Sequence, residues 1–379
     1  MSENSRLKIT DIKIINLWTI EEIGEIEPAW DLGGRMQMRR GGGSYTEVHT
    51  DQGLVGIGPR TDPSLLPSAK AHLVGKDPFD TEQHTAVLRY YAAGLPYRGV
   101  AGIDIALWDL VGKASGQPLY KIWGGAKDRV KPYASLIKLS TPEERAELAG
   151  MLKSQGWKAL KIRIHHETLK QDIETVEAVR NAVGDDMDIM VDANQAQSSG
   201  DWQPGFQWDF RRAVETAREL QQLGCFWLEE PLPRFQFHRL SELQQKVEIP
   251  IAGGENNQLV PEFLWMCQEG VYDLLQPESM VMDGVTALRK VGVLAEVYGK
   301  QIVPHHGGGD LGVIAHLHLV ASWRHAPYME LLHDPPIADY RHRFSIMSNP
   351  PITDDEGYMD VPQGPGLGVE IDKDLILED

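Results

Sequence analysis

From about residue 131, strand-like and helix-like segments alternate along this 379-residue chain, and this alternation limits its possible folds more than any other feature. The apolar runs ALKIRIH and DIMVDANQ precede LKQDIETVEAVRNAVG and DFRRAVETARELQQLG, in which apolar residues recur at three- and four-residue spacing. A strand followed by a helix recurs about eight times in roughly 220 residues, which is typical of a (β/α)8 barrel. We therefore expect an α/β fold of the TIM-barrel type.

The chain before the barrel follows a different pattern. It begins with the strand-like ITDIKIINLW, continues through a Gly- and Arg-rich loop at residues 33–43, and then forms a predicted hairpin, SYTEVHTDQGLVGIG, around a DQG turn. The segment AGIDIALWDLVGKASG has helical spacing. These features predict an α+β domain over residues 1–128, the barrel over 129–350, and a turn-rich tail over 351–379 that packs back on the barrel or the first domain.

Ionisable residues follow most of the predicted barrel strands. In such barrels the active site lies at the C-terminal ends of the strands. Apolar runs that finish in a charge are costly as core, because a buried unpaired charge costs several kcal/mol. These positions are therefore candidates for function: Lys161, Arg163, His165, Asp192, Glu229, Glu230, Glu255, Glu278, His305, His306 and Glu330.

Three consecutive predicted strands end in acids: Asp192, then Glu229 or Glu230, then Glu255. Each acid alone is explained equally well as a helix cap or a partner of a nearby base. Three acids in sequence, however, would converge on one small volume. Carboxylate oxygens suit a hard divalent cation such as Mg2+, so the pattern predicts a metal site.

The next two strands offer a carboxylate and a histidine. A carboxylate such as Glu278 that holds one ring nitrogen of a histidine fixes its tautomer and makes the other nitrogen a general base. His305 and His306 are both candidates, because the phase of IVPHH does not decide which side chain faces inward.

Four stretches resemble the mandelate racemase subgroup of the enolase superfamily: GIDIALWDLVGKASGQPLYKIWGG, VDANQA, WLEEPL and GGENN. The likeness extends over nearly the whole chain. The resemblance implies a modified (β/α)8 barrel with an N-terminal α+β capping domain. It also implies one Mg2+ per subunit, with Mn2+ as a substitute, and removal of the proton α to a carboxylate to form an enediolate.

Position by position, the resemblance also implies roles for individual residues. It makes Asp192, Glu229 and Glu255 the metal ligands, pairs His305 with Glu278 in a catalytic dyad, and places Glu330 against the substrate carboxylate on the side away from the metal. Glu278 departs from the family, which usually has an Asp there. Glutamate is one methylene longer, so it can orient His305 if the strand end shifts slightly.

A second departure is Arg163, which replaces the second lysine of the Lys-x-Lys motif usual in the family. Arginine is effectively always protonated, so Arg163 is a poor base and a good partner for a carboxylate or enediolate oxygen. His165 lies two residues further along the same strand and points to the same side. It is either a second base or a histidine packed at the barrel rim. We expect Lys161 to lie deeper, beside a metal ligand.

These residues lead us to expect dehydration of a sugar acid, an aldonate or aldarate, to a 2-keto-3-deoxy acid. A cycloisomerase, epimerase or racemase acting on a sugar acid or its lactone through the same intermediate is the alternative. Loss of the second lysine disfavours racemisation, which needs a base on each face. A non-catalytic sugar-acid binding protein is a third possibility, which a positioned base disfavours.

The resemblance also implies that loops of the capping domain determine specificity; in this chain these are residues 21–40 and the segment near residue 60. Trp30, Arg35, Arg39 and Arg40 are candidate contacts for hydroxyl or distal carboxylate groups. A solvated basic loop explains each of them equally well. Several arginines would suit a diacid.

Charge and composition argue against other classes of function. The formal net charge of −18 disfavours nucleic acid and acidic membrane surfaces as partners, and no run approaches the roughly 18 apolar residues of a membrane span. Cys225 and Cys267 lie in separate apolar stretches, which predicts a reducing, cytoplasmic location. The family resemblance predicts a homo-oligomer, a dimer or an octamer.

Overall fold

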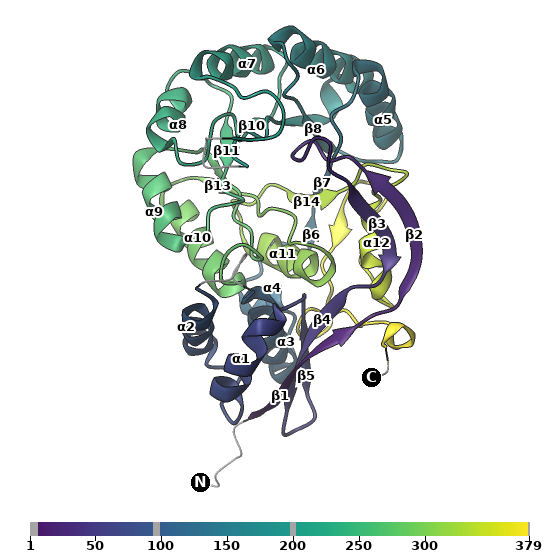
Figure 1. Cartoon of the computed structure of the whole chain (residues 1–379), viewed down its shortest axis with the longest axis vertical. Helices are drawn as coiled ribbons and strands as arrows, with labels where there is room; N and C mark the ends of the chain where they lie inside the picture. The colour runs from purple at the N-terminus through teal and green to yellow at the C-terminus, as the bar shows by residue number, and fades with distance from the viewer. Residues whose placement is uncertain (1–6, 94–98, 198–201, 378–379) are drawn as a thin grey trace.

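The computed structural model describes residues 7–93, 99–197 and 202–377. Residues 1–6 lie outside the described residues. Figure 1 shows a barrel ringed by helices, with a smaller unit of strands and helices against it. Within the described ranges, no helix is long and apolar enough to cross a membrane.

Eight parallel strands form the barrel, which confirms the expected fold. Their order is β13-β12-β11-β10-β9-β8-β7-β14, so the last strand lies beside the first. The strands are β7 (Pro132–Ser135), β8 (Ala159–Arg163), β9 (Asp188–Asp192), β10 (Trp227–Glu229), β11 (Ile251–Gly253), β12 (Leu274–Leu275), β13 (Gln301–Ile302) and β14 (Met329–Leu332).

A helix connects each barrel strand to the next. These helices are α5 (Pro142–Ser154), α6 (Leu169–Val183), α7 (Phe210–Gln222), α8 (Phe237–Gln244), α9 (Val260–Glu269), α10 (Val285–Val297) and α11 (Asp310–Ser322). After β14 the described residues form one short α-helix, α12 (Tyr340–Arg343), and two 3-10 turns, so no long helix follows the eighth strand there. Local sequence explains where some helices begin: Thr141 caps α5 by accepting a hydrogen bond from the backbone of Glu144, with Pro142 in the first turn.

The interior of the barrel consists of an apolar layer with an ionisable layer above it. Side chains from the eight strands or their flanks form the apolar cluster: Tyr133, Ala159, Met190, Trp227, Ala252, Leu274, Val303 and Tyr328. Successive inward-facing residues of a strand are two positions apart. The residues two positions beyond Ala159, Met190 and Trp227 are Lys161, Asp192 and Glu229, which are all fully buried. The strand period thus puts the charges directly above the packed floor.

The N-terminal unit is a three-stranded antiparallel sheet covered by helices. Its strand order is β1 (Ile9–Asn16), β4 (Ser44–Thr50) and β5 (Val55–Gly58), and the predicted hairpin is β4–β5. The helices are α1 (Leu66–Leu73), α2 (Thr81–Ala92), α3 (Ala101–Ser115) and the short α4 (Leu119–Ile122). Gly56 and Gly58 let α3 approach the sheet closely, because a Cβ at either position would lie 2.1 Å from a carbonyl oxygen of that helix.

The expectation of a loop at residues 33–43 was wrong for most of that segment. Residues Met36–Gly41 form β3, which pairs antiparallel with β2 (Thr19–Ile26). The alternation of Met36 and Met38 with polar neighbours matches a strand, and Met38 is buried in a cluster that includes Ile137 of the barrel. This ribbon extends alongside the barrel (Figure 1). Its turn reaches the barrel, where the backbone N–H of Ala29 donates to the carbonyl of Ile137 (2.9 Å).

The C-terminal residues contact both units. Strand β15 (Met359–Asp360) pairs antiparallel with β6 (Arg129–Val130), just before the first barrel strand. The backbone N–H of Leu367 donates to the carboxylate of Asp109 on α3 (2.8 Å). The tail therefore ties the smaller unit to the barrel.

Candidate active site

Three carboxylates meet at the C-terminal edge of the sheet. Asp192 ends β9 and Glu229 ends β10, directly opposite each other in the parallel register, and Glu255 follows β11 by two residues. Carboxylate oxygens of the three lie within 4.8 Å of one another, and all three side chains are buried. Burial, reinforced by the charge of Glu229, raises the pKa of Asp192 to about 7. This excess of buried negative charge favours a cation.

The donor set fits Mg2+. Three carboxylates, with room for water or substrate oxygens, are typical of a hard-cation site. The Oε2 atom of Glu255 is buried and makes no hydrogen bond with the described residues, so it keeps acceptor capacity for a cation. The neighbouring Glu230 has a backbone φ of 46°, and its carboxylate lies 3.4 Å from the amide nitrogen of Gln197. It is Glu229, and not Glu230, that belongs to the cluster.

Lys161 lies at the base of the cluster and is fully buried. Its Nζ lies 2.6 Å from Glu229 Oε1, 3.1 Å from Glu330 Oε1 and 3.5 Å from Asp192 Oδ2. Burial lowers the pKa of Lys161, but the carboxylates outweigh it and raise the pKa above its usual range. Lys161 is therefore a fixed positive charge.

Glu330 is the second of the four residues of β14 rather than a residue at its end. It is buried beside Lys161, and strand β14 continues for two residues beyond it, further than the sequence indicated. Burial raises the pKa of Glu330, but Lys161, His305 and the other nearby cations together outweigh burial and hold the pKa far below its usual range.

Arg163 is held by contacts on several sides. Its guanidinium donates to Asp192 and to the carbonyl of Leu136 (2.9 Å). It also donates to Ser135 Oγ (3.2 Å) and lies 4.9 Å from the ring centre of Trp30 in the β2–β3 turn. These contacts leave Arg163 charged and link the barrel to the turn above it.

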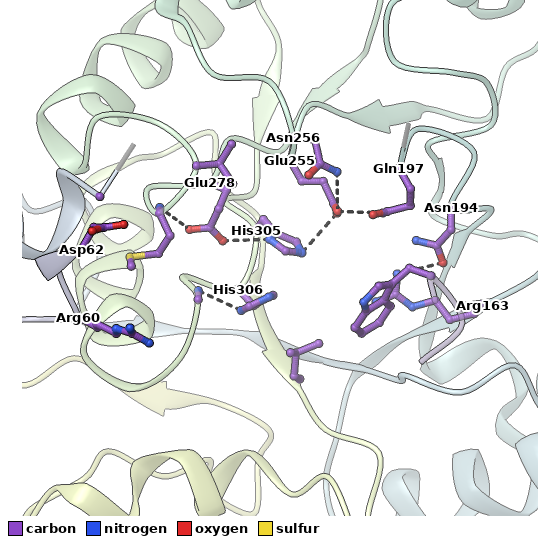
Figure 2. A pocket seen from close by; sticks show the side chains of 16 residues that line it. Arg60, Asp62, Arg163, Asn194, Gln197, Glu255, Asn256, Glu278, His305 and His306 are labelled. Carbon is purple, nitrogen blue, oxygen red and sulfur yellow. Dashed lines mark hydrogen bonds and ion pairs between the residues drawn. The ribbon is translucent and has the colours of Figure 1, made fainter. Parts of the chain in front are cut away.

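His305 and Glu278 form a hydrogen-bonded pair (Figure 2). The distance from His305 Nδ1 to Glu278 Oε2 is 2.9 Å, and Glu278 also accepts backbone hydrogen bonds from Gly307 and Met280, both 2.9 Å. A carboxylate accepts only, so Nδ1 carries the hydrogen and Nε2 faces Glu255 Oε2 at 3.3 Å. Burial lowers the pKa of His305, but Glu255 and the other carboxylates outweigh it and raise the pKa to about 10.

The other two histidines are placed differently. His306 lies at the cavity wall, where its Nδ1 accepts from the backbone of Gly308 (3.0 Å). His165 is 1% exposed, and its Nε2 lies 2.9 Å from the carbonyl of Ala29. It is absent from the described lining of the cavity, and burial lowers its pKa. The contact with Ala29 joins the barrel rim to the capping turn.

A cavity of about 490 Å³ opens above these groups. Glu255, Glu278 and His305 line it, with Arg163 and Trp30 on one side. In Figure 2, Arg60 and Asp62 lie at the opposite side of the cavity from Arg163 and Asn194. Figure 2 also shows Gln197 and Asn256 directed at Glu255, whose Oε1 accepts from both, at 3.3 and 3.2 Å.

The segment around residue 60 was an expected specificity loop, but Arg60 and Asp62 were not among the candidate residues of the sequence, and neither were Asn194, Gln197 and Asn256. The amides follow Asp192 and Glu255 closely in sequence, which was the available signal. Among the arginines expected at the cap, Arg35 and Arg40 form ion pairs with Glu25 (2.7 Å) and Glu21 (3.4 Å), and neither lines this cavity.

Two protein-family models and several curated proteins match this sequence. Residues 143–375 match the model of the enolase C-terminal domain-like family, and residues 44–124 match the N-terminal domain of mandelate racemase and muconate lactonizing enzyme. The arabinonate dehydratase of Saccharolobus solfataricus is 30% identical over 88% of this chain and 89% of its own length. The D-galactarolactone cycloisomerase of Agrobacterium fabrum is 29% identical over the same shares of the two chains.

A solved structure of a sugar-acid dehydratase is also similar to this chain over its whole length. The D-glucarate dehydratase of Agrobacterium tumefaciens, complexed with magnesium, superposes with a TM-score of 0.83 at 26% identity, covering 99% of this chain and 100% of the other. The chain belongs to the enolase superfamily, with the domain pair of its mandelate racemase and muconate lactonizing enzyme branch.

Proposed function

We propose that this protein is a Mg2+-dependent sugar-acid dehydratase in which His305 removes the proton α to the substrate carboxylate. The observation that carries the proposal is that His305, held by Glu278, and the carboxylate Glu255 line one cavity. The base and the cation site are therefore close enough to act on the same carbon and its carboxylate.

Asp192, Glu229 and Glu255 would hold the metal. Bound Mg2+ supplies a Lewis acid that stabilises the negative charge developing on the substrate carboxylate. Lys161 holds Glu229 and Glu330 in place, and Arg163 keeps a permanent positive charge beside Asp192. These fixed charges require no rearrangement as the proton leaves.

Proton transfer follows from the tautomer of His305. Glu278 accepts from Nδ1–H, so the basic atom is Nε2. Glu255 is the main carboxylate that raises the pKa of His305, so a cation held by Glu255 would offset that charge and leave Nε2 free to take the α-proton when the C–H bond breaks. The same Nε2–H then protonates the β-hydroxyl as the C–O bond breaks and water leaves. The resulting enol tautomerises to the 2-keto-3-deoxy acid, and the enzyme returns to its starting protonation state.

Chemistry with bases on both faces has less support. Arg163 is a permanent cation on the strand that usually carries the second lysine, and His165 is bonded to Ala29 outside the described cavity lining. Cycloisomerisation of a sugar-acid lactone begins with the same proton transfer and returns the proton to the product without loss of water, and the cycloisomerase among the relatives keeps it as the second candidate. We further propose that the enzyme assembles as a homo-oligomer, as its family resemblance implies.

The test is incubation with Mg2+ and a library of aldonic and aldaric acids, assayed for 2-keto-3-deoxy products. The same library with lactones in D2O then detects α-proton exchange without water loss, which would indicate the cycloisomerase. His305→Asn should remove turnover and leave Mg2+ affinity nearly unchanged, with His306→Asn as the matched neighbour. Retention of more than about one percent of activity in His305→Asn would exclude His305 as the principal base.

A further inference from the structure

A second cavity, of about 290 Å³, adjoins the catalytic one. The two cavities share Arg60, Met280 and Gly308 as walls. The rest of the second cavity is formed by β3, the turn at residues 41–44, the start of α11 and the segment around α12. It therefore lies where the capping unit meets the chain that follows the barrel.

The charge of this second cavity is opposite to that of the protein. Arg39, Arg60 and Arg343 line it, and Asp310 is the one acid among its described lining residues. Three arginines less one aspartate give a formal charge of +2, in a chain whose net charge is −18. We call this space the arginine cavity.

These three guanidinium groups differ from their neighbours in forming no ion pair at contact distance within the described residues, although Asp310 attracts Arg343 electrostatically. Arg39 and Arg60 are exposed to solvent. Arg40, next to Arg39 on β3, is paired with Glu21, and Arg341, in the same helix as Arg343, is paired with Asp339. The guanidinium groups of Arg39, Arg60 and Arg343 make no hydrogen bond or ion pair with the residues that the structure describes.

The backbone holds these arginines together. Gly41, Gly42 and Gly43 have φ values of 67°, 75° and 80°, and a Cβ on Gly42 would stand 3.2 Å from Arg39 Nε. The glycines thus make room for the Arg39 side chain to lie over the turn. The backbone N–H of Gly41 donates to Ser345 Oγ (2.7 Å), which fixes the turn beside the segment that carries Arg343.

We infer that the arginine cavity binds the distal carboxylate of a dicarboxylic sugar acid, so that the substrate is an aldarate rather than an aldonate. This inference rests on the proposed function, which brings the other carboxylate to the metal site. Guanidinium groups bind carboxylates through paired, charge-assisted hydrogen bonds. Arg60, Met280 and Gly308 line both cavities, so the two spaces adjoin, and we place the distal end of the substrate on the Arg60 side, in the arginine cavity.

The test compares acids that differ only at the distal carbon. Dissociation constants of galactarate and galactonate, and of glucarate and gluconate, are measured by calorimetry with Mg2+ present. The variants are Arg343→Gln and Arg39→Gln, with Arg341→Gln as the matched control in the same helix. Urea unfolding and Mg2+ titration establish that each variant is folded and binds metal.

In at least one pair, the wild-type protein should bind the diacid at least about tenfold more tightly than the monoacid. Arg343→Gln should reduce this preference to within about threefold by weakening the diacid alone, while Arg341→Gln leaves it unchanged. Absence of a diacid preference, failure of both diacids to bind, or equal weakening of both acids by Arg343→Gln would overturn the inference.

The two proposals fail in different ways. Proton exchange or dehydration of monoacids without a diacid preference keeps the proposed function and overturns the arginine cavity. Diacid binding that depends on Arg343, without exchange or dehydration of any library member, supports the cavity and overturns the proposed reaction.

Discussion

Replacing Lys161 by methionine removes the one ammonium group that three buried carboxylates share. Methionine keeps most of the length of the side chain and loses the charge. Lys161 Nζ lies 2.6 Å from Glu229 and 3.1 Å from Glu330, and all three side chains are fully buried. Glu229 would keep its bonds from Gln276 (2.7 Å) and Trp227 (3.1 Å), but Glu330 would lose its ion pair.

Removing one partner of a buried ion pair costs about 3–5 kcal/mol, because the remaining charge stays buried without compensation. We therefore expect Lys161→Met to lower the free energy of unfolding by about 4 kcal/mol in EDTA. Saturating Mg2+ should reduce that loss in part, since a bound cation compensates Asp192 and Glu229, two of the three carboxylates that Lys161 contacts, and stabilises only the folded state that binds it.

Urea unfolding, followed by circular dichroism with EDTA or with Mg2+, measures both quantities. Lys158→Met is the control, because Lys158 is exposed three residues earlier in the chain and should change stability by less than about 0.5 kcal/mol. A loss below about 1 kcal/mol in EDTA, or an equal loss with and without Mg2+, would refute the reasoning.

Three further predictions follow from other contacts. Glu255→Gln should weaken Mg2+ binding at least about tenfold, and an unchanged calorimetric titration would remove Glu255 from the ligand set. His165→Asn should lower thermal stability through its contact with Ala29 and leave stereospecific α-proton exchange intact; loss of exchange on one face would instead make His165 a second base. Burial holds the pKa of His318 at about 4, below its ordinary 6.5. Between these two pH values the unfolded state binds more protons than the folded state, so the free energy of unfolding should fall by about 3 kcal/mol from pH 6.5 to 4. His318→Gln does not titrate and should lack that part of the loss, and identical urea-unfolding profiles against pH would disprove the assignment.

The sequence determined the barrel and the neighbourhood of its chemistry. The strand and helix periods are local properties, and so is the cap at Thr141, so they can be read without knowing any contact. Parallel strands of a barrel bring their C-terminal ends together whatever the details of packing. Acids at successive strand ends, such as Asp192 and Glu229, therefore had to converge.

Only the tertiary structure decided features that depend on contacts between distant segments. Residues 36–41 became a strand because β2 lies beside them, and Met38 is buried against the barrel. The position of Glu330 within its strand depends on how that strand pairs with β7. Without the family resemblance, choosing between Glu229 and Glu230 requires the backbone conformation at Glu230, which the sequence does not show.

The arginines show the same limit. On the sequence, Arg39 and Arg40 are equivalent neighbours, and nothing distinguishes Arg341 from Arg343. In the fold, Glu21 and Asp339 lie close enough to pair with Arg40 and Arg341, while Arg39 and Arg343 line a common cavity. Whether a charge is paired depends on which segments the fold brings to it, and no local pattern carries that information.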